Sequence, residues 1–290
     1  MQSQPRNVQR VIHPQSVSDG AGVKLKRSIA SGALDYLDPF LLFDHFGSDH
    51  PDDYMAGFPM HPHRGIETVT YMLAGNVDHR DSLGHSGSIG PGDVQWMTAG
   101  SGILHEEMPQ LRGGELDGFQ LWVNLPAKQK MSPPRYQEYT KWEIPEVVRP
   151  DGVKIKVIAG SADDTHGPVT EIAANPTYLD VFLPSGVSFT HPVPRGHGAF
   201  AYVYQGEGHF GASEKEKGTP ISQLALAVLG DGDFLKVTAG KSDLRFLLVS
   251  GKPLHEPVAR YGPFVMNTEE EIEETLKDLE RGTFIKKQKQ

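Results

Sequence analysis

The apolar residues of this chain occur mostly in short runs that are bounded by glycine and proline. Residues 119–123 (FQLWV) have the alternating pattern of a barrel strand, and residues 71–75 and 90–97 predict two further strands joined through a polar, glycine-rich stretch. The segment 8–30 predicts one or two edge strands, whereas the run 37–46 predicts buried core. With 32 glycines and 22 prolines spread along the chain, the pattern predicts an all-β protein of short strands and tight turns.

One part of this pattern occurs twice. Residues 90–100 (GPGDVQWMTAG) match residues 230–240 (GDGDFLKVTAG) at six of eleven positions without a gap, and residues 71–75 correspond to residues 202–206. Two copies of one β fold explain this better than a single irregular domain. Because residues 126–152 become rich in proline and mixed in charge, we predict a first domain at 1–130, a linker at 131–152 and a second domain at 153–290.

The last part of the chain, residues 268–282, departs from the β pattern. Thr268 and Glu271 have the spacing of a capping box, and Gly282 suits the end of a helix. Ile272, Leu276 and Leu279 share one helical face. This narrow apolar face predicts a single C-terminal helix docked on a barrel.

Two pairs of residues have the spacing of side chains on one face of a strand. His61 and His63 flank Pro62, and Glu107 follows His105 by two positions. Pro62 cannot donate to a ladder, which predicts a strand start, an edge or a bulge. A His-Pro-His stretch alone is more often a surface turn than a metal site. Three imidazoles and one carboxylate that meet inside a barrel, however, suit a divalent first-row metal and leave room for water or substrate.

The second copy is predicted to lack these ligands. An offset of 140 puts Arg245 and Leu247 opposite His105 and Glu107, and counting back from residue 206 puts Pro192 and Pro194 opposite His61 and His63. Other residues near the first motif have different expected roles. We expect His45 and His50 to be structural or surface residues, and His79 and His85 to lie on a solvated loop, with the mouth of a pocket as the alternative. We expect Gly65, Gly100 and Gly102 to leave space near a metal. Apolar walls and ordinary core are equal alternatives for Met60, Met97, Met108 and Phe119.

Four motifs resemble those of a known family. Residues 60–68 (MHPHRGIET), 102–109 (GILHEEMP), 121–126 (LWVNLP) and 257–268 (PVARYGPFVMNT) are similar to cupin metal motifs, and to those of the pirin family in particular. The resemblance covers nearly the whole chain and implies a bicupin, with two jelly-roll-like barrels in tandem and a C-terminal helix. In pirins the two motifs hold one iron; carried over position by position, the ligands are His61, His63, His105 and Glu107. The resemblance therefore implies one Fe(II), or another divalent metal, in the N-terminal domain.

The same resemblance implies two functions of different kinds. Pirin-like proteins of this pattern are associated with dioxygenase activity on quercetin, which implies a small aromatic substrate, O₂, and Glu107 as the candidate catalytic base. Animal pirins instead act as nuclear, iron-dependent cofactors that bind transcription regulators. The sequence leaves this protein-binding alternative open, together with a substrate that is not a flavonoid.

Composition narrows the chemistry further. The formal net charge of −9 argues against non-specific nucleic-acid binding, which depends on basic surface. The absence of cysteine excludes disulfides and thiolate catalysis and leaves a metal only nitrogen and oxygen ligands. No apolar run has the length of a membrane span. The first basic residue, Arg6, is not followed directly by the apolar stretch of a secretory signal. We therefore expect a cytoplasmic protein, nuclear as well if the source is eukaryotic.

Overall fold

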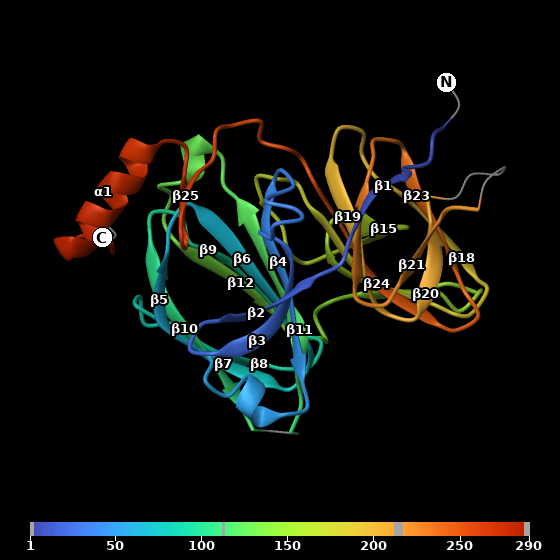
Figure 1. Cartoon of the computed structure of the whole chain (residues 1–290), viewed down its shortest axis with the longest axis horizontal. Helices are drawn as coiled ribbons and strands as arrows, with labels where there is room; N and C mark the ends of the chain where they lie inside the picture. Colours follow the sequence, from blue (N-terminus) through green and yellow to red (C-terminus); the bar gives the residue numbers. More distant parts are fainter. Residues whose placement is uncertain (1–2, 112–113, 212–216, 287–290) are drawn as a thin grey trace. The chain divides into compact units, whose positions relative to one another are not determined.

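The computed structural model describes residues 3–111, 114–211 and 217–286. The chain divides into two compact units. We call Ser16–Ala30, Phe40–Lys141 and Leu254–Gln290 the N-terminal barrel, and Met1–Gln15, Ser31–Pro39 and Trp142–Pro253 the C-terminal barrel. Each unit has one seven-stranded and one four-stranded antiparallel sheet, so the predicted all-β fold is confirmed (Figure 1).

The N-terminal barrel carries both histidine motifs. Its larger sheet has the order β12-β9-β6-β11-β4-β3-β2, with bounds Arg135–Tyr139, Val94–Thr98, Ile66–Ala74, Leu116–Asn124, Phe40–Ser48, Val23–Ile29 and Gln15–Asp19. Its smaller sheet has the order β5-β10-β7-β8, with bounds Phe58–His63, Ile103–Gln110, Asn76–Asp81 and Ser86–Ile89. Two short 3₁₀ helices (Pro51–Asp53 and Ala127–Gln129), the hairpin of β25 (Ala259–Tyr261) and β26 (Phe264–Met266), and helix α1 (Glu269–Glu280) complete the unit.

The C-terminal barrel repeats this plan. Its larger sheet has the order β1-β22-β19-β24-β17-β14-β13, with bounds Val8–Ile12, Ala225–Leu229, Gly198–Gln205, Leu244–Gly251, Thr177–Leu183, Lys154–Ala159 and Glu146–Val148. Its smaller sheet has the order β18-β23-β20-β21, with bounds Ser188–Pro192, Phe234–Ala239, Glu207–Phe210 and Thr219–Ser222. A two-stranded ladder joins β15 (Ser161–Ala162) to β16 (Thr165–His166).

The two sheet orders correct the alignment at an offset of 140. Strands β9-β6-β11-β4 correspond to β22-β19-β24-β17, and β5-β10-β7-β8 to β18-β23-β20-β21. Residues 90–93 lead into β9, whereas residues 230–233 lead into β23, the counterpart of β10. The alignment is therefore wrong by one strand. A Gly-x-Gly-Asp turn can precede any strand, whereas a strand's hydrogen-bonded neighbours define its place in the sheet.

The grouping of the chain also differs from the linear boundaries 1–130, 131–152 and 153–290. Residues 131–152 do not form a separate linker, because they supply edge strand β12 to the N-terminal barrel and edge strand β13 to the C-terminal barrel. The first residues pair with β22 through β1, and in Figure 1 the blue β1 accordingly lies among the yellow and orange strands. Residues 254–290, including α1, group with the N-terminal barrel.

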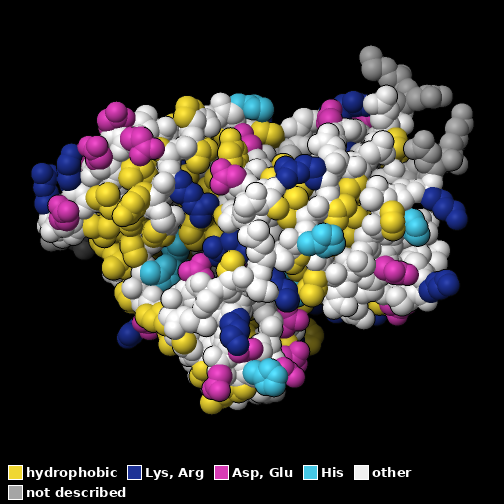
Figure 2. Space-filling view, viewed as in Figure 1, with side chains coloured by type: hydrophobic (Ala, Val, Ile, Leu, Met, Phe, Trp, Pro, Cys, Tyr) yellow, Lys and Arg dark blue, Asp and Glu magenta, His cyan; other side chains and the backbone are white. Residues whose placement is uncertain are grey.

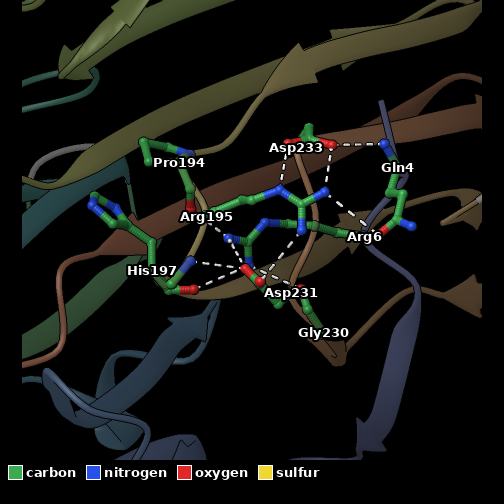
Figure 3. A network of polar contacts seen from close by, with 9 residues as sticks. Gln4, Arg6, Pro194, Arg195, His197, Gly230, Asp231 and Asp233 are labelled. Carbon is green, nitrogen blue, oxygen red and sulfur yellow. Dashed lines mark hydrogen bonds and ion pairs between the residues drawn. The ribbon is translucent and has the colours of Figure 1, made fainter. Parts of the chain in front are cut away.

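A buried arginine fixes the N-terminal segment to the C-terminal barrel (Figure 3). Arg6 is fully buried, and its guanidinium donates to the backbone oxygens of Pro194, His197 and Gly230 and pairs with Asp231. Backbone carbonyls on a loop and a turn of this barrel thus take a charged donor from a segment about 200 residues away in sequence.

The C-terminal helix forms as predicted. Thr268 and Glu271 make both bonds of a capping box, and Gly282, in the left-handed region at φ 67°, closes the other end. Ile272 packs into an apolar cluster with Phe264 and Phe284, and Leu276 and Leu279 lie against it. Figure 2 shows acidic side chains on the outer surface of α1 with hydrophobic side chains beside it. Within the described residues, no helix has the length and apolar character needed to span a membrane.

The helix also has a polar attachment that the apolar pattern does not predict. Arg64, 1% exposed, donates from Nε to Ser101 O (2.8 Å) and from Nη1 to Thr275 Oγ1 (3.1 Å) and Asp278 Oδ2 (2.9 Å). It also donates to Phe284 O and lies 4.4 Å from the centre of the Phe284 ring. The residue next to His63 thus joins the first metal motif to α1.

Candidate metal centre

Strands β5 and β10 bring the two histidine motifs together. They are antiparallel neighbours in which His105 lies opposite His61 and Ile103 opposite His63. Along β10 buried residues alternate with partly exposed ones, which turns His105 and Glu107 inward. Strand β5 is an edge strand, and its pairing with β10 shifts register between His105 and Glu107. Of the three places that Pro62 allowed, the edge strand is confirmed, and Pro62 itself pairs in register with Leu104.

Three imidazoles converge at this point. One ring nitrogen of each of His61, His63 and His105 lies within 4.8 Å of the others, the one such group of three histidine, cysteine or acidic residues in the described ranges. The ring centres of His61 and His105 are 4.4 Å apart, and those of His63 and His105 are 5.1 Å apart. His63 and His105 are buried at 3% and 1% exposure, and His61 is half-buried.

The hydrogen bonding of these rings fits a bound cation. His61 Nδ1 lies 3.0 Å from Pro59 O; as the donor there, it leaves a lone pair on Nε2, which faces His63 Nε2 at 3.0 Å. Neither ring nitrogen of His105 has a hydrogen-bond partner among the described residues, although both are buried. Buried nitrogens without partners are costly unless a ligand satisfies them. A divalent metal between the three rings would do so.

The electrostatics keep two of these histidines neutral. Burial, and then the nearby His61 ring, lower the pKa of His63 to about 3. Burial also lowers the pKa of His105 well below its usual range, with further contributions from His63 and His61. Both imidazoles are therefore unprotonated near neutral pH, which is the form that binds metals.

Glu107 lies apart from the three-histidine group. Its carboxylate is not within the 4.8 Å set, and its Oε1 accepts a hydrogen bond from Thr70 Oγ1 at 3.0 Å. The side chain is 8% exposed and borders the same cavity as His61 and His63. The structure thus brings three of the four predicted ligands together and holds the fourth at the wall of the shared cavity.

A cavity of about 530 Å³ opens beside the histidines. Trp122 also lines the cavity, and its ring lies 5.1 Å from the His63 ring in an edge-on arrangement. Its apolar lining comes from Val23, Leu25, Leu42, Phe46, Phe58, Val77 and Leu116, and its polar lining includes Arg27, Asp44, Thr70, Gln120 and Arg260.

The sequence did not indicate most of these cavity residues. None of Met60, Met97, Met108 and Phe119 is among the described residues that line it. The glycines near the ligands admit neighbouring chain rather than a ligand, since a Cβ on Gly65, at φ 79°, would lie 2.0 Å from Val265 O. A strand-wise count of inward positions could have found Thr70 and Gln120, but only after the sheet register was known.

A row of polar side chains crosses the larger sheet opposite the histidines. Direct cross-strand pairing connects one residue on each of six strands, β12, β9, β6, β11, β4 and β3: Glu138, Gln95, Thr70, Gln120, Asp44 and Arg27. Arg27 and Asp44 form a two-pronged ion pair at 2.9 and 2.7 Å, and Gln95 Nε2 donates to Glu138 Oε2 at 3.1 Å. We call these six residues the polar row.

One histidine that the sequence left as solvated belongs to this interior. His79 is 7% exposed on β7 and its Nε2 lies 3.0 Å from Glu138 Oε2. His85 is exposed and bonds Asp81 through Nδ1 at 2.8 Å, as expected of a loop residue. His45 is half-buried and bonds Asp117.

The C-terminal barrel has a different interior. Its inward positions on β18 and β23 are Phe189, His191, Leu235 and Val237, and a closed apolar cluster of buried residues surrounds them. The cross-strand row through Ala227, Ala201, Leu248, Leu179 and Val157 is entirely apolar. This barrel therefore offers neither the histidines nor the polar row.

Both halves of the chain are similar to one known protein family. Residues 22–123 match the family model for pirin, and residues 178–285 match the model for the pirin C-terminal cupin domain. A pirin-like protein of Caulobacter vibrioides is 45% identical over 280 residues, 96% of this chain and 99% of that protein. The chain belongs to the pirin family. These matches confirm the predicted pair of cupin barrels.

Two other similar proteins have names that state an enzymatic activity. A Pseudomonas aeruginosa protein, named provisionally as a quercetin 2,3-dioxygenase, is 46% identical over 274 residues, 93% of this chain and 94% of that protein. The crystal structure of quercetin 2,3-dioxygenase from Acinetobacter baumannii aligns with a TM-score of 0.87 at 34% identity, over 97% of this chain and 98% of that one.

Proposed function

We propose that this member of the pirin family is a metal-dependent dioxygenase that acts on quercetin or a related flavonol. The supporting observation is the contrast between its barrels. One encloses three converging imidazoles, a carboxylate and a cavity of about 530 Å³, and the other has an apolar core. That volume lies within the usual range of small-molecule sites. The names of the Pseudomonas and Acinetobacter proteins support the substrate class.

The chain supplies four groups to hold a metal. His61, His63 and His105 would bind a single divalent ion, for which we propose Fe(II), with Glu107 as the fourth ligand. The bound metal would supply Lewis acidity toward a substrate oxygen and redox chemistry with O₂.

The protein's own contribution begins with a proton. A flavonol becomes electron-rich when its hydroxyl is deprotonated, and the Glu107 carboxylate at the cavity wall would accept that proton, as a ligand or while detached. The base must reach the hydroxyl within hydrogen-bond distance, and Glu107 lines the same cavity as His61 and His63.

The side chains of the cavity wall would bind the substrate and exclude water. Its apolar side chains, among them Leu25, Phe46 and Leu116, would pack against the flat rings and keep water away from the substrate anion. The Trp122 ring, edge-on to His63, would limit the directions from which a planar ligand approaches.

The test is oxygen consumption coupled to loss of the quercetin absorbance band. When air is admitted, protein loaded anaerobically with Fe²⁺ should consume dissolved oxygen and quercetin together. Glu107→Gln should abolish this turnover even where some metal stays bound. Glu106→Gln is the matched control, because Glu106 is the preceding residue on β10 but pairs with Arg80 on the outside. It should behave as the wild type.

The alternative function predicts a different result. If iron-loaded protein takes up no oxygen with quercetin or related flavonols, yet binds a transcription regulator only when metal is present, the enzyme proposal should be replaced by the protein-binding one.

A further inference from the structure

The Glu107 carboxylate is held from across the barrel interior. Glu107 lies on β10 of the smaller sheet, and its partner Thr70 lies on β6 of the larger one. The Thr70 hydroxyl is 3.0 Å from Glu107 Oε1, and the Thr70 side chain is 3% exposed. This is a contact between two sheets, so neither local sequence nor strand pairing requires it.

The polar row fixes the direction of that hydroxyl. Thr70 is the direct cross-strand neighbour of Gln120, and its Oγ1 lies 2.8 Å from Gln120 Oε1. A threonine hydroxyl has one hydrogen to donate, and a carboxylate can only accept. The hydroxyl can therefore donate to Glu107 Oε1 or to Gln120 Oε1, but not to both. Turning the Gln120 amide by half a rotation brings its NH₂ to the hydroxyl, so that Gln120 donates to Thr70 and Thr70 donates to Glu107. The resulting chain runs Gln120 to Thr70 to Glu107.

Only one oxygen of Glu107 is used in this way. Oε2 has no hydrogen-bond partner among the described residues, and the side chain borders the cavity beside His61 and His63. A glutamate has three side-chain torsions to restrict before it can ligate, and ligating carboxylates are commonly held by a hydrogen bond to the second oxygen.

We infer that Thr70, oriented by Gln120, is a positioning residue that presents Glu107 to the metal. This inference rests on the proposed metal site. Thr70 holds Oε1 and leaves Oε2 to the ion, so loss of the hydroxyl should weaken binding. If Thr70 instead competed with the ion for the carboxylate, its loss would strengthen binding. The sign of the change therefore tests the inference.

The experiment measures the affinity of the metal-free full chain for Co²⁺, followed by the visible absorption of the bound ion. Thr70→Val removes the hydroxyl while keeping the side-chain shape, and Thr70→Ser restores it. Thr68→Val is the matched control, because Thr68 is buried, faces the same interior two residues earlier, and pairs with Met97 and Trp122 instead of the polar row. Glu107→Gln and His105→Ala report on the site itself, and Thr70→Ala replaces Thr70→Val if that variant does not fold.

We expect Thr70→Val to bind Co²⁺ about 10- to 100-fold more weakly than the wild type, the usual effect of losing a group that orients a ligand. Its Co²⁺ spectrum should shift toward that of Glu107→Gln. Thr70→Ser and Thr68→Val should bind as the wild type does. The double variant Thr70→Val, Glu107→Gln should bind no more weakly than Glu107→Gln alone, because Thr70 acts only through Glu107.

Two results would overturn the inference while leaving the metal site intact. One is wild-type or tighter Co²⁺ binding by Thr70→Val when Glu107→Gln and His105→Ala bind weakly. The other is equal weakening by Thr68→Val, which would indicate a general packing effect. If His105→Ala and Glu107→Gln both bind Co²⁺ as the wild type does, the proposed site is itself wrong and the inference falls with it.

Discussion

Replacing Arg64 should loosen the C-terminal helix and destabilise the N-terminal barrel. Arg64→Met keeps an unbranched side chain but removes four hydrogen bonds, to Ser101 O, Thr275 Oγ1, Asp278 Oδ2 and Phe284 O. Breaking a buried ion pair from one side typically costs about 3–5 kcal/mol. Because Asp278 keeps Lys286 Nζ at 2.7 Å, we expect the lower end, about 3 kcal/mol.

The assay combines urea unfolding with amide hydrogen exchange of residues 269–280. Arg80→Met is the matched control, because Arg80 pairs with Glu106 at the surface with its side chain 67% exposed. Exposed pairs of this kind contribute roughly 0–1 kcal/mol. If Arg64→Met costs no more than Arg80→Met and leaves exchange of α1 unchanged, the reasoning about Arg64 is wrong.

The same contact predicts a pH dependence. Burial opposes ionisation of Asp278, but hydrogen bonds from Lys286, Thr283 and Arg64 outweigh it and lower its pKa to about 2. A carboxyl whose pKa is lowered by folding stabilises the fold above its unfolded pKa and loses that contribution as the pH falls through its folded pKa. The attachment of α1 should therefore weaken between about pH 4 and pH 2, and Arg64→Met should reduce this dependence.

Four further predictions concern both barrels. Arg6→Met should destabilise the C-terminal barrel by roughly 3 kcal/mol in urea, since it removes charged hydrogen bonds to three backbone carbonyls; a cost below about 1 kcal/mol would contradict this. Burial, and then Arg149, lower the pKa of His191 to about 4. The free energy of unfolding should therefore fall by up to roughly 1.4 kcal/mol for each pH unit as the pH is lowered from about 6.5 to 4. His191→Leu should flatten that part of the pH profile; an unchanged slope would refute the assignment. Elemental analysis after purification with iron should give about one metal per chain, sharply reduced in His61→Ala or His105→Ala, whereas two per chain would point to a second site. Metal retention should decline in acid as the histidines protonate, and retention that ignores pH throughout the histidine range would argue against a histidine site.

The sequence was sufficient for the local features of this protein. The spacing of Thr268, Glu271 and Gly282 determines both ends of α1, because capping bonds form within a few residues. The alternation of His61 with His63, and of His105 with Glu107, fixes which side of each strand they face. The resemblance in the motifs identified the family, which the comparisons confirmed.

Only the tertiary structure decided what depends on contacts between distant segments. The match at an offset of 140 joined non-equivalent strands, and the boundary at residue 130 missed that β1 and Arg6 belong to the C-terminal barrel. The polar row is invisible in the sequence, because its six residues come from six strands and lie together only in one register. The contact between Thr70 and Glu107 likewise joins strands of two different sheets, so it too depends on the tertiary structure. Periodicity specifies the face of a strand, but the choice of neighbouring strands depends on the whole sheet, and that choice places the Glu107 carboxylate in the wall of the cavity that His61 and His63 also line.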